Sequence, residues 1–194
     1  MYPSRAVLPL VAAAAAALLS ACVIAPSKPK PLEAVVELHE VQPPEPGASA
    51  PITGELRFKQ WKDEVVINGQ VENLPLRAPQ LLRGNALHIH ETSDCSGPGA
   101  ANAGGIFNPL HRLHSWAGAG GMMGDLPMLM PDAHGVAVLK DYLSPQVKLD
   151  GPYSVIGKAI VIHRDVDDWA IQPDGRAGPG IACGVIRAVK PGEK

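Results

Sequence analysis

Alternation of apolar and polar side chains over residues 54–72 restricts the fold more than any other feature of the sequence. Residues 54–61 (GELRFKQW) alternate with a period of two, a short turn follows at Lys62-Asp63, and residues 64–72 (EVVINGQVE) continue a β-type pattern. Successive side chains of a strand point to opposite faces, so the pattern predicts an antiparallel hairpin with one buried face. Asn68-Gly69 within the second strand predicts a β-bulge.

The rest of the chain repeats short β-type segments between turns. Further strands are expected at residues 34–39, 126–130, 136–142, 158–163 and 181–189, with one more that opens at Ala86. The 20 Gly and 20 Pro residues favour turns over long helices. About eight strands without a helical period predict an all-β fold, an eight-stranded antiparallel sandwich or barrel.

Two long stretches have no periodicity and are rich in turn residues. They cover residues 91–124 and 164–180. Loops of this length in a small domain are typically functional when they are ordered. We therefore expect the fold to carry two functional loops.

The N-terminal residues predict export. Arg5 precedes the apolar run VLPLVAAAAAALL, and small residues follow up to Cys22. This pattern is typical of a signal peptide over residues 1–21, and it is too short for a membrane-spanning helix. The sequence LSAC resembles a bacterial lipobox, which implies acylation of Cys22; a plain secretory signal is the alternative.

These features divide the chain into three parts. Residues 22–33 are expected to form a lipid-anchored flexible tether, and residues 34–190 the folded domain. Val23 rather than Asp follows the lipobox cysteine, which resembles outer-membrane sorting in bacterial lipoproteins. The expected location is the periplasm of a Gram-negative bacterium, with the membrane contacted through the lipid.

The charge of the chain limits its possible binding partners, and its cysteine content predicts a disulfide. With 17 basic and 19 acidic residues the chain has no excess of positive charge, which argues against nucleic-acid binding. If Cys22 carries lipid, Cys95 and Cys183 remain, and an oxidising periplasm would pair them. Two unpaired buried thiols are the alternative.

Two histidines stand two residues apart in the stretch ALHIHETSDCS. On a strand, His88 and His90 point to the same face and form half of a metal site. The alternative is a pair of histidines on a solvated face. His39 and His134 are expected to be ordinary surface residues.

Five stretches occur in the order in which the copper-zinc superoxide dismutase family has them. They are ALHIHETSDCS, AGGIFNP with His114 beyond it, MGDLP, IVIH and ACGVI. The chain from Ala34 to Val189 therefore resembles that family, as a divergent bacterial periplasmic member of the lipoprotein type.

The resemblance implies a Greek-key barrel and a metal centre. It pairs Cys95 with Cys183 in a disulfide and assigns one copper ion to His88, His90 and His163. Imidazole is a suitable ligand for copper, which supports this part of the assignment.

Several positions depart from the pattern of the family. A histidine that bridges copper and zinc in the family corresponds to Ile106, and another zinc ligand corresponds to Met122. Only His114 and Asp125 remain of that site, whereas zinc sites have about four ligands. Zinc is therefore doubtful, and His111 is an alternative third ligand.

Two further positions concern the environment of the copper. Asp167 stands where the family has an aspartate that ties a copper-ligand histidine to a zinc-ligand one, although a solvated acidic loop is the alternative. The arginine that attracts superoxide in the family corresponds to Gly180. Arg164 or Arg176 could supply positive charge instead, although ordinary loop charges are the alternative.

The expected function is superoxide dismutation at a copper-only or weakened site, with reduced activity. The alternative is a periplasmic module that binds, buffers or delivers copper. Met122 and Met123 are candidate soft ligands for Cu(I) in that case. Met128 and Met130 alternate on an expected strand and are predicted to fill the core.

Overall fold

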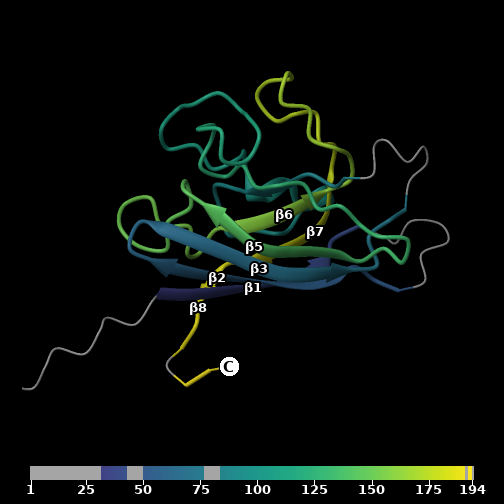
Figure 1. The fold of residues 1–194 in the computed structure, drawn as a ribbon. Coiled ribbons are helices and arrows are strands. Elements are labelled where there is room, and N and C mark those ends of the chain that lie inside the picture. Colours follow the sequence, from purple (N-terminus) through teal and green to yellow (C-terminus); the bar gives the residue numbers. More distant parts are fainter. Residues whose placement is uncertain (1–31, 43–49, 77–83, 191, 194) are drawn as a thin grey trace, which may run out of the picture. The chain divides into compact units, whose positions relative to one another are not determined.

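One antiparallel sheet of eight strands forms the framework of the chain (Figure 1). The computed structural model describes residues 32–42, 50–76, 84–190 and 192–193. The strands are β1 (Leu32–Glu40), β2 (Thr53–Trp61), β3 (Glu64–Glu72), β4 (Leu87–Ile89), β5 (Ala137–Ser144), β6 (Ala159–His163), β7 (Gly180–Val185) and β8 (Arg187–Ala188). The predicted all-β antiparallel fold is confirmed.

The N-terminal predictions fall on residues that the structure does not describe. The signal peptide, Cys22 and the tether up to residue 31 lie outside the described residues. Within the described part, no helix has the length and apolar character needed to cross a membrane.

The strand order β4-β6-β7-β1-β2-β3-β5, with β8 paired to β1, curls the sheet around its core. Apolar side chains of β1, β2 and β3 form one cluster with those of β6 and β7, including Leu56, Ile67 and Ile160. Each fully buried aliphatic side chain contributes about 1.5–3 kcal/mol to folding. Burial of these apolar side chains between the two halves of the sheet therefore stabilises the curled half-barrel.

The hairpin predicted from the alternating pattern is β2–β3. Gly54 pairs with Val71 at one end and Trp61 with Glu64 at the other. The predicted bulge is present, because the register between β3 and β5 shifts between Ile67 and Gly69. A Cβ atom at Gly69 would lie 2.1 Å from the carbonyl oxygen of Glu55, so this close approach of two strands requires glycine.

One expected strand is absent, which corrects the prediction for residues 126–130. Leu129 of this segment forms an isolated bridge with Asn85, just before β4, and Asp125, just before the segment, forms another with His88. Pro127 has no backbone N–H to donate, so a continuous ladder cannot form there.

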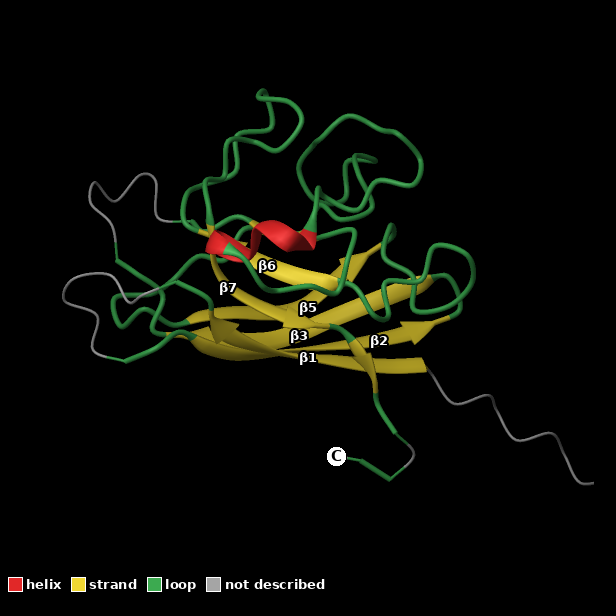
Figure 2. Cartoon of the chain, turned by 180° about the vertical axis from the view of Figure 1, so that it is seen from behind, coloured by secondary structure: helices red, strands yellow, loops and turns green. Residues whose placement is uncertain are grey.

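The two long loops rise on the same side of the sheet, above β6 (Figure 1). The first contains a short 3-10 helix, η2 (Pro98–Ala103), which lies over β6 (Figure 2). Ala100 and Ala103 of η2 pack against Val161 and Cys183. The first loop is thereby fixed above β6 and β7.

Candidate metal centre

Three histidines meet where β4 and β6 pair. His88 and His90 are 1% and 7% exposed, and Ile89 between them is in the core, as strand alternation requires. β6 runs antiparallel to β4, and the His163 backbone N–H donates to the Ala86 carbonyl over 2.8 Å. The edge of the sheet therefore brings His163 to the predicted H-x-H pair.

The second nitrogen of each ring is already hydrogen-bonded. Nδ1 of His90 donates to the Gly104 carbonyl over 2.8 Å, and Nδ1 of His163 donates to the Gly178 carbonyl over 2.9 Å. Nε2 of His88 donates to Oδ2 of Asp167 over 3.1 Å. These acceptors fix which nitrogen of each ring donates, so Nδ1 of His88 and Nε2 of the other two are the nitrogens left for a metal.

The free nitrogens of two of these rings face each other directly. Nε2 of His90 and Nε2 of His163 are 3.1 Å apart. Burial lowers the pKa of His90 to about 4 and that of His163 to about 3, so both rings are neutral at pH 7. Two lone pairs at this distance repel unless a cation lies between them.

One donor atom from each of His88, His90 and His163 lies within 4.8 Å of the other two. Three imidazoles that converge in this way suit copper. The chemistry of the donor set therefore fits the metal that the sequence predicts for this place.

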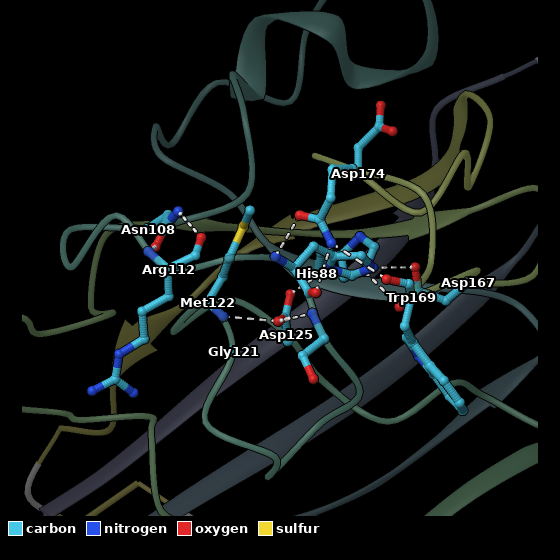
Figure 3. Close-up of polar contacts among 12 residues, drawn as sticks. His88, Asn108, Arg112, Gly121, Met122, Asp125, Asp167, Trp169 and Asp174 are labelled. Carbon is cyan, nitrogen blue, oxygen red and sulfur yellow. Dashed lines mark hydrogen bonds and ion pairs between the residues drawn. The ribbon is translucent and has the colours of Figure 1, made fainter.

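A second cluster lies beside His88 and contains the remaining zinc-site positions His114 and Asp125, of which Figure 3 labels Asp125. Nδ1 of His114 donates to Oδ1 of Asp125 over 2.9 Å, and Nε2 donates to Oδ1 of Asp167 over 2.9 Å. Burial alone would lower the pKa of His114, but hydrogen bonds and charges from the two carboxylates outweigh it and raise the pKa to about 9. The His114 ring is therefore a buried cation.

Asp167 links this cluster to the three-histidine group. Its two carboxylate oxygens accept from His88 and from His114. Burial alone would raise the pKa of Asp167, but these hydrogen bonds outweigh it and hold the pKa well below its usual range. This contact pattern is the one that the sequence resemblance implied for Asp167.

The carboxylate of Asp125 also accepts hydrogen bonds from backbone N–H groups. Oδ2 of Asp125 accepts from the N–H of Ser115 over 3.1 Å and from that of Met122 over 2.9 Å. The Met122 side chain extends away from Asp125 while its backbone nitrogen faces it (Figure 3). Met122 thus contributes its amide to the cluster.

The substituted positions lie around these two groups. Ile106 is 8% exposed and pairs with His90 through an isolated bridge, but its side chain has no donor atom. His111 is exposed, and the converging donor groups among the described residues do not include it.

Gly180 lies in a place where no side chain fits. A Cβ atom there would be 2.6 Å from the Gly99 carbonyl oxygen and 2.6 Å from Cγ1 of Val161. Of the alternative cations, Arg164 forms an ion pair of 2.8 Å with Asp165, and Arg176 is exposed.

Cys95 and Cys183 are joined by a disulfide across 88 residues of sequence, as predicted. In the chain-entropy treatment, closing a loop of this length contributes about 4–5 kcal/mol to stability. The bond attaches the segment before η2 to β7, close to the histidines.

The predictions for two methionines need correction. Met130 is 60% exposed, and Met128 is half-buried with its sulfur accepting the Asp167 N–H over 3.3 Å. They do not fill the core, because the segment is not a strand and its side chains do not alternate. Met122 and Met123, the candidate soft ligands, are 6% and 4% exposed.

Two glutamines fix the loops and carry no sequence signal. The side-chain amide of Gln172 bonds both the N–H and the carbonyl of His114, over 2.8 and 2.9 Å. Gln146 accepts from the Gly118 N–H over 3.0 Å and donates to the Met122 carbonyl over 2.7 Å. A lone glutamine belongs to no motif, so only the folded structure identifies these anchors.

Comparison with known proteins agrees with this geometry. The sequence profile of the family described as Copper/zinc superoxide dismutase (SODC) matches residues 52–186. The chain belongs to the copper/zinc superoxide dismutase family. The resemblance found in the sequence is thereby confirmed at the level of the family.

Relatives of this superoxide dismutase family member include proteins with different names. It is 34% identical over 139 residues to Superoxide dismutase [Cu-Zn] 1 of Aquifex aeolicus (strain VF5), covering 69% of this chain and 79% of the relative. It is 31% identical over 140 residues to the superoxide dismutase-like protein YojM of Bacillus subtilis (strain 168), covering 69% and 68%. The crystal structure of the clock protein EA4 superposes with a TM-score of 0.68 at 28% identity, covering 84% of this chain and 98% of that one.

Proposed function

We propose that this protein is a superoxide dismutase that works with a single copper ion bound by His88, His90 and His163. The observation that carries the proposal is the convergence of one ring nitrogen from each of these three histidines within 4.8 Å of the other two. Each of the three rings is oriented by a hydrogen bond from its other nitrogen, which is the usual arrangement of metal-binding histidines.

Copper, when bound, supplies one-electron chemistry that converts superoxide into dioxygen and peroxide. The protein provides three histidine ligands, and the hydrogen bond from the other nitrogen of each ring keeps it in one orientation. Ile106 has no titratable group, so the protons that peroxide requires come from water. This absence supports an activity below that of family members with a bridging histidine.

Charge around the site supports the same reduction in rate. Gly180 carries no cation, and the guanidinium of Arg164 is paired with Asp165. Electrostatic guidance raises encounter rates by about 10- to 1,000-fold. Weak guidance slows encounter with superoxide without removing the redox chemistry.

Metal analysis and pulse radiolysis test the proposal. Protein purified without added metal should contain one copper and no zinc per chain, and its turnover of superoxide should exceed that of free aqueous copper. His163→Ala should lose both copper and turnover, whereas His134→Ala, a change of an exposed histidine, should lose neither. Turnover no higher than that of aqueous copper would refute dismutation.

A copper-binding or copper-delivery module is the second candidate. The tight packing of Gly180 against Gly99 supports it, because this backbone has no room for a guiding arginine. Rapid transfer of Cu(I) from the protein to a chelator, combined with no superoxide turnover, would favour this function.

We also propose that the protein is a lipoprotein of the periplasm, anchored through Cys22 and directed to the outer membrane. The lipobox-like LSAC sequence and the pairing of the other two cysteines support this location. Mass spectrometry of the mature N-terminus and fractionation of cells that express Cys22→Ala test it. An unmodified Cys22 in membrane-free fractions would refute it.

A further inference from the structure

The cluster of His114, Asp125 and Asp167 does not fit a zinc ion. Two ligands bound at about 2.0–2.1 Å to a tetrahedral zinc stand about 3.3 Å apart. Nδ1 of His114 and Oδ1 of Asp125 are 2.9 Å apart, which is the distance of a direct hydrogen bond. Ile106 and Met122 offer no further nitrogen or oxygen ligand from their side chains.

The donor atoms of the cluster are also fully used. His88, His114 and Asp167 bring one donor atom each within 4.8 Å of one another, which could suggest a metal. Both oxygens of Asp167, however, accept hydrogen bonds from these two rings. A metal bound at this place would have to break both bonds.

The surrounding backbone is shaped around the hydrogen-bonded arrangement. A Cβ atom at Gly175 would lie 2.1 Å from Oδ1 of Asp167 and 2.8 Å from Nε2 of His114, and one at Gly121 would lie 2.5 Å from Oδ2 of Asp125. Two glycines from different loops thus leave the space that the carboxylates occupy. The amide of Gln172 then fixes the backbone on both sides of His114.

We infer that the His114 side chain replaces the second metal of the family: it bridges Asp125 and Asp167 and thereby positions His88. The chain of contacts is continuous, from Asp125 through both nitrogens of His114 to Asp167, and from Asp167 to Nε2 of His88. His114 is a positioning residue, since it acts on the copper ligand through Asp167. The inference rests on the proposed function only in taking His88 as a ligand of copper.

The copper-free wild-type protein tests the bridge directly. Long-range 1H–15N NMR of the His114 ring should show a proton on both nitrogens at neutral pH. Titration with Zn²⁺ alone should show no zinc bound at this cluster, whereas the double variant Ile106→His/Met122→His should bind one zinc per chain. Zinc bound by His114 and Asp125 of the wild-type protein, or a His114 ring with a bare nitrogen, would overturn the inference.

Two amide variants test whether His114 positions His88. The amide nitrogen of glutamine can replace Nε2 and keep the bond to Asp167, whereas that of asparagine can replace only Nδ1 and keep the bond to Asp125. Loss of an outer partner of a ligand histidine typically lowers metal affinity about 10- to 100-fold. We expect this loss, with a changed Cu²⁺ EPR spectrum, in His114→Asn, and largely restored values in His114→Gln.

The matched control is His111→Gln, an exposed histidine of the same loop, which should leave the EPR spectrum unchanged. Equal spectra and affinities in the wild type and both His114 variants would overturn the positioning role. If the wild type binds no copper at all, the proposed function fails, but the NMR and zinc experiments still decide whether His114 replaces the metal.

Discussion

The three-histidine group and the His114 cluster use the same side chain in opposite ways. Each ring of the first group has one nitrogen bonded to an acceptor and one nitrogen free, and the His90 and His163 rings are neutral because burial lowers their pKa values. Both nitrogens of His114 are bonded to carboxylates, so the ring is charged. The number and charge of the acceptors decide whether a buried histidine is a ligand or a cation.

Removal of one histidine of the first group should have the largest effect. His163→Ala leaves two imidazoles, which is too few to hold copper in a three-ligand site, so copper affinity should fall by more than the 10- to 100-fold typical of an outer partner. Competition for copper with a chelator measures the change. Retention of wild-type copper affinity would show that His163 is not a ligand of copper.

Asp167 is shared by both groups, so changing it should affect both. Asp167→Asn removes the charge between His88 and His114 and offers only one acceptor atom in place of two. Breaking a buried ion pair on one side costs about 3–5 kcal/mol of stability. Chemical denaturation should show this loss of stability, and copper binding should also be weaker. A change in only one of these two properties would show that Asp167 does not couple the two groups.

The two groups should also give opposite pH dependence to the stability of the copper-free protein. His90 and His163 have folded-state pKa values of about 4 and about 3, below the unfolded value of about 6.5, so the unfolded state binds more protons and stability falls as pH drops below about 6.5. His114 has a folded-state pKa of about 9, so its contribution is complete below about 6.5 and is lost as pH rises through about 9.

Denaturation midpoints measured between pH 4 and 10 check both dependences. Each should change the free energy of unfolding by a few kcal/mol. His114→Gln should flatten the alkaline slope and leave the acid slope in place. An unchanged alkaline slope in this variant would assign that slope to another group.

The smallest expected effect concerns Gly180, which stands where the family has its guiding arginine. Gly180→Arg places a side chain against the Gly99 carbonyl and Val161, and overpacking typically costs about 1–3 kcal/mol. We expect lower stability and no gain in the rate of encounter with superoxide. A faster rate with unchanged stability would show that this backbone has room for the guiding arginine of the family.

The sequence predicts the framework well where one physical signal dominates. Alternation over residues 54–72 predicts the β2–β3 hairpin, and Asn68-Gly69 predicts its bulge. The same reasoning fails at residues 126–130, because Pro127 interrupts the ladder although the apolar pattern continues. The prediction that Met128 and Met130 fill the core is wrong for the same reason.

The candidate site is predictable in its residues but not in its bonds. Spacing and resemblance bring together His88, His90 and His163, and they place Asp167 near His88. They say nothing of the direct bond between His114 and Asp125, since the sequence shows only which ligands are missing. Gln172 is invisible for a different reason, because its role depends on a contact between two loops far apart in sequence.

The disulfide has a consequence for when the histidines become ordered. It attaches the segment that leads into η2, and η2 is followed by Gly104, whose carbonyl accepts the hydrogen bond from Nδ1 of His90. In a reducing compartment this segment lacks its covalent restraint, and the acceptor that fixes the His90 tautomer is free to shift. Maturation of the site is thus coupled to the oxidising power of the compartment in which the chain folds.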